Sequence, residues 1–259
     1  MKSISNKIKN IEASSLSMNQ GDFDIKFVDN YLAQSAIRVL HLTNLLERNG
    51  VTSGRILDVG AYLGTFAVPL RKLGFEVTAI DTFSRFDGAL EPSMNLMENL
   101  GIQLVNVDSV SNFKIPSDLG HFDVVIAMAV IEHIPHTPKY FLEMCLGHVK
   151  RESGWLIVDT PNVTRFWNRK NLFKGDPIMM PIEGQYHSEI PFTGHHREFT
   201  LNEVKWMFGE LGLEEISGHW FDYNLFQFSE LSREHINAML TWLMDPSQMD
   251  TLMVMGRRT

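Results

Sequence analysis

The sequence predicts an α/β fold built on one doubly wound, mostly parallel sheet of seven strands. From residue 55 onward, short apolar runs alternate with stretches of helical spacing. That alternation specifies parallel strands joined by right-handed crossovers. The first of these runs ends in an acidic residue and a glycine-rich turn. With 259 residues, 44% of them hydrophobic and 21% charged, the chain has an ordinary globular composition, so we expect one domain.

The first half of the chain supplies the first four strands of the predicted sheet. Residues 1–24 are predicted to form a flexible N-terminal tail. Apolar residues then recur at helical spacing up to Asn49-Gly50, which indicates a helix and its end. Beyond this point the pattern predicts helices near 64–73 and 90–100, and strands at 55–60, 76–81, 103–108 and 122–130.

The second half is expected to form the rest of a domain that spans residues 25–259. A helix at 138–149 and a strand at 155–159 continue the pattern, and 161–199 interrupts it. Such a long excursion is more often functional than accidental, so we interpret it as a substrate-side insertion or lid. Thr200 and Glu203 have the spacing of a capping box at a helix start. We then expect an antiparallel pair from 214–219 and 221–228, and a last helix at 232–244.

Charge and composition exclude several classes of protein. A formal net charge of −8 and a pI near 5.7 argue against sequence-independent binding of nucleic acid, which needs a broad basic face. Cys145 is the only cysteine and lies among apolar residues, so we interpret it as a reduced core residue. No run approaches the ~20 apolar residues needed to cross a bilayer. A cytoplasmic protein without a membrane span is the expectation.

The turn at 60–64 differs from a dinucleotide-binding turn. Such a turn needs G-x-G-x-x-G, in which the central glycine makes room for a pyrophosphate. This chain has Gly60-Ala-Tyr-Leu-Gly64, which lacks the central glycine, and Asp58 stands two residues before Gly60. A nicotinamide dehydrogenase therefore fits poorly, although Asp81 follows at a suitable distance.

Asp58, Gly60 and Gly64 match the acidic-x-Gly-x-Gly-x-Gly motif, so this segment resembles the class I S-adenosylmethionine-dependent methyltransferases. Tyr62 replaces the middle glycine of that motif. The family's cofactor carries no phosphate, so a bulkier residue at this position is physically plausible. The resemblance covers about residues 35–228. It implies a Rossmann-like fold and S-adenosyl-L-methionine as the cofactor.

Later strand ends repeat the family's motifs in order. The resemblance implies that Asp81, followed by Thr82, binds both ribose hydroxyls, since two acceptor oxygens suit two neighbouring donors. Asp108, with its neighbour Ser109, corresponds to the residue that holds the adenine amine. The fourth motif implies that the methionine part of the cofactor is lined by Ala127, Met128, Ala129 and His133. Ligands of open parallel sheets bind beyond these strand ends, so the acceptor should approach there, beneath 161–199.

The segment Gly194-His-His-Arg-Glu-Phe-Thr200 holds the candidate catalytic residues. Methyl transfer from a sulfonium mainly requires alignment of nucleophile, methyl carbon and sulfur. An alcohol acceptor also loses a proton, and a neutral imidazole is a suitable base. We therefore predict His195 or His196 as the base, then His133, with Arg197 holding hydroxyls or an anionic group. Alternatively, His195 caps the loop and Arg197 pairs with Glu198.

The acceptor is predicted to be a small hydroxylated molecule. The stretch from Thr160-Pro-Asn162 through the histidine segment resembles bacterial methyltransferases that act on sugars of surface glycans or natural products. This favours O-methylation of a sugar or glycan precursor and a role in carbohydrate biosynthesis. Two alternatives stay open: N- or C-methylation of a natural-product or quinone-like acceptor, and cofactor binding without turnover.

No metal site is predicted. Glu132-His133 resembles methyltransferases that place a divalent metal at Glu-x-x-Glu-His, but Ala129 stands at the first glutamate position. A softer site would need a further histidine, and scattered histidines are more often structural. The histidines in question are His136, His187, His195 and His196.

Two further patterns have a functional and a structural interpretation. Four cations would form a stripe beside aromatic residues if 163–174 is helical, namely Arg165, Arg169, Lys170 and Lys174. They fit a phosphate of a nucleotide-linked or lipid-linked sugar, or simply a solvated helix face. A group of methionines fits adaptable contacts with a substrate or a second subunit in a homodimer, or core filling: Met179, Met180, Met244, Met249, Met253 and Met255.

Overall fold

The structure, a computed structural model, describes residues 25–86, 88–107, 113–188, 192, 194–223 and 233–259. The predicted tail at 1–24 lies outside these residues, as do Asp108 and Ser109. The chain forms two compact units, Met1–Asp108 and Ser109–Thr259, and each is described by itself. Among the described residues, no helix is long and apolar enough to cross a membrane.

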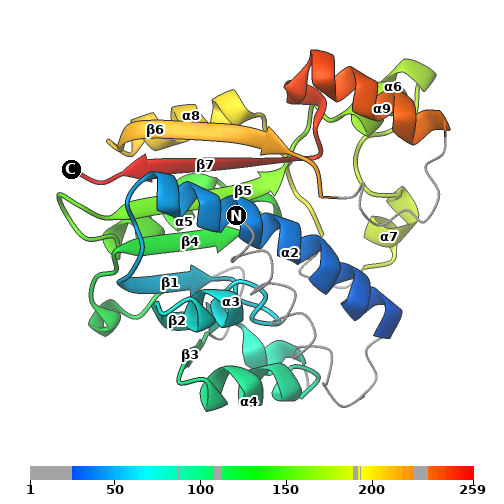
Figure 1. Cartoon of the computed structure of the whole chain (residues 1–259). Coiled ribbons are helices and arrows are strands. Elements are labelled where there is room, and N and C mark those ends of the chain that lie inside the picture. Colours follow the sequence, from blue (N-terminus) through cyan, green and yellow to red (C-terminus); the bar gives the residue numbers. More distant parts are fainter. Residues whose placement is uncertain (1–24, 87, 108–112, 189–191, 193, 224–232) are drawn as a thin grey trace. The chain divides into compact units, whose positions relative to one another are not determined.

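The first unit is a parallel three-stranded arrangement with helices between the strands (Figure 1). Strand β2 is central and pairs with β1 on one side and β3 on the other. Apolar side chains of β1 are fully buried, as expected for a strand covered on both faces. The elements in chain order are α2 (Ile25–Arg48), β1 (Arg55–Val59), α3 (Ala67–Lys72), β2 (Glu76–Asp81), η1 (Phe83–Phe86), α4 (Glu91–Asn99) and β3 (Gln103–Asn106).

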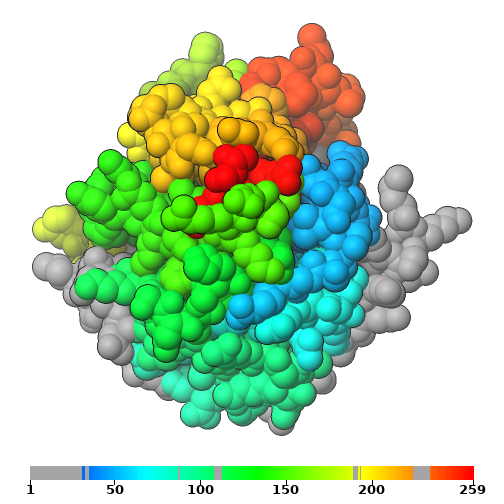
Figure 2. All heavy atoms as spheres, turned by 90° about the vertical axis from the view of Figure 1, so that its left-hand side faces the viewer, coloured from blue at the N-terminus to red at the C-terminus, as the bar shows by residue number. Residues whose placement is uncertain are grey.

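The second unit holds four strands. Strand β4 (Val124–Met128) runs parallel to β5 (Trp155–Pro161), while β7 (Thr251–Arg257) runs antiparallel to β5 and to β6 (Glu214–Phe221). Figure 2 shows the end of β7, in red, between the orange and green segments of the neighbouring strands. The other elements are η2 (Ser117–Leu119), η3 (Ile131–His133), α5 (Pro138–Gly147), α6 (Phe166–Lys174), α7 (Ile182–Tyr186), α8 (Leu201–Glu210), α9 (Arg233–Met244) and η5 (Pro246–Gln248).

The seven strands have the sheet order β3-β2-β1-β4-β5-β7-β6. Within the first unit β1, β2 and β3 run parallel, and within the second unit β7 alone runs against β4, β5 and β6, which agrees with the predicted Rossmann-like, doubly wound, mostly parallel sheet. The two strand runs expected at 103–108 and 122–130 are shorter in the structure, as β3 and β4.

The predicted partner of β6 was wrong. We expected 214–219 to pair with 221–228, of which residues 224–228 lie outside the described part of the chain. In the structure, β6 itself extends to Phe221 and pairs with β7. Strand β7 was not predicted, because Leu252–Met255 is a short apolar run in which apolar and polar residues do not alternate. Its residues are buried on both faces, where periodicity cannot distinguish a strand from a helix.

Several local predictions agree with the structure. Thr200 and Glu203 form the predicted capping box at the start of α8. The Cys145 thiol is fully buried, and burial raises its pKa, so it is an inert core residue as predicted. The methionines divide: Met253 and Met255 fill the core in β7, whereas Met179, Met180 and Met244 are exposed. The proposed lid region contains α6 and α7.

Candidate functional site

In the first unit, the turn after β1 depends on two glycines. Gly60 and Gly64 have φ values of 83° and 73°, which glycine adopts without strain. The amides of Gly60 and Ala61 donate to the Ile80 carbonyl at 2.8 and 3.2 Å, which ties the turn to β2. A Cβ on Gly64 would lie 2.7 Å from the sulfur of Met97. The turn therefore keeps the backbone close to the end of β2.

Asp81, at the end of β2, is the polar centre of this turn. Its Oδ2 accepts from the Tyr62 amide at 2.7 Å and its Oδ1 accepts from the Thr82 amide at 2.6 Å. Burial raises the pKa of the Asp81 carboxyl, and these hydrogen bonds oppose that shift. Oδ1 also accepts from the Thr82 hydroxyl at 3.3 Å, whereas Oδ2 accepts from one amide and keeps a lone pair for one further donor. The ribose role of Asp81 stays a prediction.

Tyr62 takes the place of the family's middle glycine and keeps a glycine-like backbone, with φ at 47°. Its ring meets Tyr31 edge-on at a centroid distance of 5.6 Å and Phe86 at 5.4 Å. Burial, followed by the neighbouring Tyr31 and Asp81, raises the pKa of the phenol to about 12. Tyr62 is therefore a neutral aromatic wall of the turn at ordinary pH.

The other predicted cofactor residues of the first unit are buried. Asp58, the acidic residue of the first motif, is 1% exposed and lies on β1. Thr82 is 3% exposed and follows β2 directly. The roles predicted for both residues stay predictions.

In the second unit, the end of β4 has an unusual backbone. Ala127 and Met128 are buried, while Ala129 adopts a φ of 55°. The Ala129 amide donates to the carboxylate of Asp159 at 2.7 Å and to its carbonyl at 3.1 Å. A non-glycine residue in this region is strained by about 1–3 kcal/mol and occurs often at functional sites. The bend leads directly into η3 and its Glu132-His133 pair.

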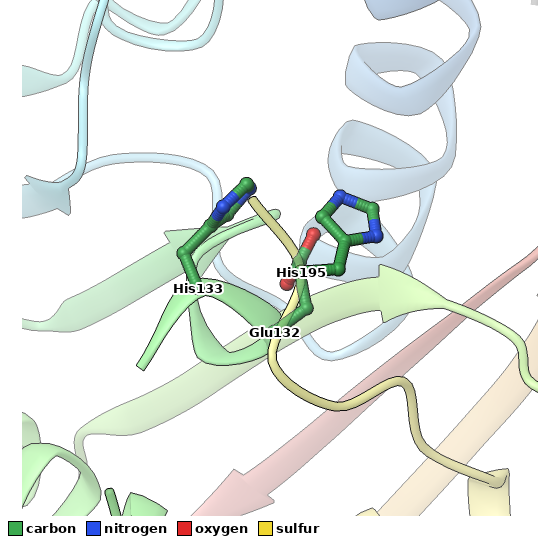
Figure 3. Close-up of side chains that lie close together, drawn as sticks. All are labelled: Glu132, His133 and His195. Carbon is green, nitrogen blue, oxygen red and sulfur yellow. The ribbon is translucent and has the colours of Figure 1, made fainter. Parts of the chain in front are cut away.

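Glu132, His133 and His195 form one group of side chains, which we call the histidine–glutamate cluster (Figure 3). One potential ligand atom from each residue lies within 4.8 Å of the others. The two imidazoles meet edge-on, with centroids 4.8 Å apart. Glu132 is fully buried and its Oε2 accepts from the Thr160 hydroxyl at 3.1 Å. Figure 3 shows the Glu132 carboxylate between the two rings.

Main-chain contacts join the two segments that carry this cluster, which are η3 and the loop with His195. The amide of His196 donates to the Glu132 carbonyl at 2.7 Å, so the loop is fixed to η3 beside His195. A parallel bridge joins Asn162 to Phe199 on the other side of the loop. His133 and His195, which are 62 positions apart in the sequence, are therefore brought together by a defined contact.

His195 is oriented by an acidic partner. Its Nδ1 lies 3.2 Å from Oε1 of Glu198, and Arg165 binds both oxygens of that carboxylate at 2.5 and 3.1 Å. The hydrogen bond to Glu198 outweighs burial and raises the pKa of His195. For Glu198, burial acts to raise the pKa, but the bonds from His195 and Arg165 prevail and lower it. The side chain of Glu198 is only 6% exposed, so this is a buried, ordered chain of charges.

The other two predicted catalytic residues lie outside the cluster. His196 contacts the Phe192 carbonyl through Nε2 at 3.1 Å and packs against the Phe192 ring. The Arg197 side chain is 65% exposed, pairs with Glu203 at 2.6 Å and lies over Phe199. The alternative pairing of Arg197 with Glu198 is therefore wrong, since Glu198 binds Arg165 and His195.

Residues of the predicted cationic stripe form ion pairs with acidic side chains. Arg169 lies 3.4 Å from Asp245, and Lys170 lies 2.5 Å from Glu234. With Arg165 bound to Glu198, these pairs favour the structural interpretation of the stripe over phosphate binding.

Sequence reasoning missed the residues that support the cluster. Arg165, Thr160 and Asn168 are far from His195 in sequence, and no local spacing connects them. Asn168 donates to Glu198 at 3.3 Å and to the Val163 carbonyl at 2.9 Å, and it is almost fully buried. Asn168 is a polar residue on a short helix, and this was the only feature of the sequence that pointed to its role. Glu198, three residues after His195, was considered only as a partner of Arg197.

Sequence comparison gives one family match. Residues 30–217 match the family described as "Methyltransferase domain". A ubiquinone biosynthesis O-methyltransferase from Rickettsia felis is 33% identical over 134 residues, which cover 50% of this chain and 52% of that protein. The chain thus spans about half the length of the curated relatives it matches.

Solved structures show the same fold at low sequence identity. A methyltransferase from Archaeoglobus fulgidus has a TM-score of 0.52 and 17% identity, covering 85% of this chain and 94% of that one. Magnesium protoporphyrin IX methyltransferase from Synechocystis PCC 6803, with bound SAH, also has a TM-score of 0.52. Its identity is 14%, and the match covers 95% of this chain and 92% of that chain. At these identities the likeness concerns the fold alone.

Proposed function

We propose a chemical role from one established premise: the chain belongs to the methyltransferase domain family, and its cofactor is S-adenosylmethionine. The role is transfer of the cofactor's methyl group to a hydroxyl oxygen of a small molecule. The histidine–glutamate cluster carries this proposal, because an oxygen acceptor must lose a proton and two imidazoles stand where strand β4 ends. An acceptor without an ionisable proton would have no need of them.

Residues proposed to contact the cofactor are assigned in each unit by itself. In the first unit we assign Asp81 to the ribose hydroxyls, with Thr82 beside it, and the turn to the methionine end. That turn contributes Asp58, Gly60, Tyr62 and Gly64. In the second unit we assign Ala127, Met128, Ala129 and His133 to the methionine part. Asp108, the last residue of the first unit, and Ser109 are assigned to the adenine.

An aromatic hydroxyl is the acceptor class we propose first. The support is the name of the curated relatives, ubiquinone biosynthesis O-methyltransferase, which indicates O-methylation of a quinone precursor by those proteins. The sugar acceptor expected from the sequence has no such support among these relatives. A sugar panel therefore serves as the second arm of the test.

The chemistry needs alignment and removal of one proton. The acceptor oxygen must approach the methyl carbon opposite the sulfur, so that the C–S bond breaks as the O–C bond forms. The hydroxyl proton leaves through the cluster, where His195 is the first candidate base because Glu198 fixes its ring. Arg197, which pairs with Glu203, is proposed only to steer an anionic acceptor.

Cofactor binding tests the first half of the proposal. Asp81→Ala should weaken S-adenosylhomocysteine binding about 10- to 100-fold by calorimetry, since each donor left unpaired costs about 1–3 kcal/mol. Glu76→Ala is the matched control, because Glu76 is an exposed acid at the opposite end of the same strand. Equal affinity in the two variants would remove Asp81 from the site.

Turnover tests the second half. With labelled S-adenosylmethionine, the protein should methylate a catechol or hydroxybenzoate acceptor faster than free or nucleotide-linked sugars. His195→Ala should lower turnover by ~10²-fold or more and leave S-adenosylhomocysteine affinity unchanged. His187→Ala, in an exposed histidine of the same insertion, should retain activity. Cofactor binding without methylation of any acceptor would point instead to a binding protein.

A further inference from the structure

We infer that Glu132, His133 and His195 form a binding site for one divalent first-row transition metal ion, of the Zn²⁺ or Co²⁺ type. The inference rests on the proposed function, because the ion would act on the acceptor hydroxyl. It departs from the sequence analysis, which predicted no metal. The observation behind it is that three ligand atoms from two distant segments converge in one place.

The distances fit a site that closes slightly on an ion. Bonds from zinc to imidazole nitrogen and carboxylate oxygen are about 2.0–2.2 Å long, so tetrahedral ligand atoms lie roughly 3.4 Å apart. In the structure, the three atoms all lie within 4.8 Å of one another. Both imidazoles are half-buried, and binding of the ion would require the ligand atoms to move closer together.

The ligand types select the class of metal. Two imidazole nitrogens and one carboxylate oxygen suit zinc and its first-row neighbours, whereas Mg²⁺ and Ca²⁺ prefer oxygen ligands throughout. The position that would add a second carboxylate holds Ala129. Three protein ligands leave at least one coordination position for an oxygen of the acceptor, as in catalytic zinc sites.

The residues around the cluster provide independent support. Histidines that bind metals usually donate their other ring nitrogen to a carboxylate, which fixes the tautomer and the orientation of the ring. His195 does this through Nδ1 and Glu198, which leaves Nε2 as its ligand atom. Glu198 is held in turn by Arg165 and Asn168.

The carboxylate ligand has the same kind of support. The Thr160 hydroxyl donates to Oε2 of Glu132 at 3.1 Å, which helps to fix the orientation of the carboxylate. A histidine outside the cluster lacks this arrangement, since His196 contacts a main-chain carbonyl rather than an acid. The carboxylate partner thus distinguishes His195 from His196.

In this arrangement the ion would bind the acceptor hydroxyl and lower its pKa, as metals do for bound water. One proton passes from the bound hydroxyl to solvent, and the methyl group passes from sulfur to the resulting oxygen anion. The products are a methyl ether, S-adenosylhomocysteine and one proton, so the step balances without a further reactant. The imidazoles then serve as ligands, and His195 acts as a base only in metal-free protein.

Direct metal binding is the test. The full chain is treated with a chelator, dialysed and titrated with Co²⁺, followed by visible absorption and calorimetry. We expect one equivalent of Co²⁺ with visible d–d bands, displaced by Zn²⁺. His133→Ala and His195→Ala should each weaken Co²⁺ binding by 100-fold or more. Glu198→Gln leaves all three ligands in place and should weaken it about 10- to 100-fold.

The control variant is His187→Ala, which removes an exposed histidine outside the cluster and should bind Co²⁺ like the parent. Thermal unfolding of each apo variant separates loss of the ligand from loss of the fold. Glu132 is fully buried, so its substitution could unfold the protein. The test therefore uses the variants of the two half-buried histidines and Glu198→Gln.

Two results would overturn the inference. One is the absence of stoichiometric Co²⁺ binding by the parent protein, and the other is equal binding in the parent and the two histidine variants. Metal-free protein that transfers methyl groups as fast as metal-loaded protein would also overturn it and leave the proposed function standing. Failure of the parent to bind S-adenosylhomocysteine would contradict the proposed function, while the Co²⁺ titration stays interpretable.

Discussion

Tyr62 combines an aromatic side chain with a backbone conformation that favours glycine. Its φ of 47° is costly for a residue with a Cβ, by about 1–2 kcal/mol, but its ring packs against Tyr31 and Phe86. The contacts of the ring therefore offset the strain of the backbone. This balance explains how a residue with a Cβ is accommodated at this position of the turn.

Two substitutions at Tyr62 separate these effects. Tyr62→Ala removes the ring and keeps the strain, whereas Tyr62→Gly removes both. We expect the glycine variant to be more stable than the alanine variant by about 1 kcal/mol in urea unfolding, because only alanine pays for the left-handed backbone. Tyr62→Phe keeps the ring and should unfold like the parent. An alanine variant as stable as the glycine variant would mean that the turn relaxes.

For single residues, the sequence predicted where the candidate site residues lie along the chain but not which residues they contact. Asp81 and the Glu132-His133 pair were identified because acidic and imidazole residues followed predicted strands, and strand ends converge at one sheet edge. The contact of His195 with Glu198 and Arg165 could not be predicted, since Arg165 lies 33 residues from Glu198 and α6 had no defined position. Asp108 and Ser109 stay predictions.

Among the elements, α8 begins with a complete capping box. Thr200 accepts from the Glu203 amide, and Glu203 accepts from the Thr200 amide at 2.8 Å. Thr200→Ala should lower the free energy of unfolding by about 1 kcal/mol, measured by urea titration. A loss below a few tenths of a kcal/mol would show that the helix start is held mainly by packing of its buried residues.

The capping box also makes stability depend on pH. Burial would raise the pKa of Glu203, but hydrogen bonds from Thr200 and Arg197 outweigh it and lower the pKa. A carboxyl with a depressed folded pKa stabilises the protein above its unfolded value, near 4.3, and loses this contribution as pH falls through the folded pKa. The parent should therefore exceed Glu203→Gln in stability at pH 6, and the difference should shrink as the pH falls below about 4.3.

Glu210→Gln is the matched control for this pH series, because Glu210 is an exposed acid at the other end of α8. Its stability difference from the parent should be smaller than that of Glu203→Gln at pH 6. The side chain of Glu203 is 40% exposed, so the whole effect belongs to the range of surface interactions. A difference that does not change with pH would assign it to something other than the carboxylate.

Strand β7 is packed so closely that a single methyl group should be felt. A Cβ on Gly256 would lie 2.8 Å from the Phe208 ring and 3.1 Å from the Leu213 side chain. Gly256→Ala should therefore destabilise the protein by about 1–3 kcal/mol. Gly209→Ala, on α8, meets nothing within 4 Å and should stabilise it by about 0.5–1 kcal/mol. Urea unfolding should thus give opposite signs for the two variants.

Local sequence patterns located some helices and strands but not others. Helices with strong end signals, such as α8, and strands followed by glycine turns, such as β1, were located within a few residues. Strand β7 was missed because its apolar run has no period and because β6, its partner, was assigned to the segment that follows it in the chain. Pairing between strands 30 residues apart is decided by tertiary contacts.

For the whole molecule, cofactor binding should raise thermal stability. A ligand that binds only the folded state at 100 times its Kd adds about 2.7 kcal/mol. For a chain of this length that corresponds to a rise in Tm of roughly 5–10 °C. S-adenosylhomocysteine should produce this rise in the parent by calorimetry. At the same concentration Asp81→Ala should give a much smaller one. An equal rise in both would place the ligand elsewhere.

The sequence predicted the order of helices and strands better than their grouping into compact units. The alternation from residue 55 predicted a mostly parallel sheet of seven strands, and the structure has such a sheet, but its seventh strand is Thr251–Arg257 rather than the predicted 221–228. Composition predicted one domain, and within the chain the contacts concentrate in two compact units. The acceptor could not be predicted, because its recognition depends on side chains brought together by the fold rather than on a motif.

The interior position of β7 has a consequence for biosynthesis. It is the last of the seven strands in chain order, yet it lies between β5 and β6. A nascent chain synthesised from its N-terminus exposes the open edges of both neighbours until residues 251–257 leave the ribosome. Open strand edges are sites of aggregation, so chaperone dependence during translation should concentrate in this interval. Ribosome-bound chains arrested before and after β7 would reveal it as a difference in chaperone occupancy.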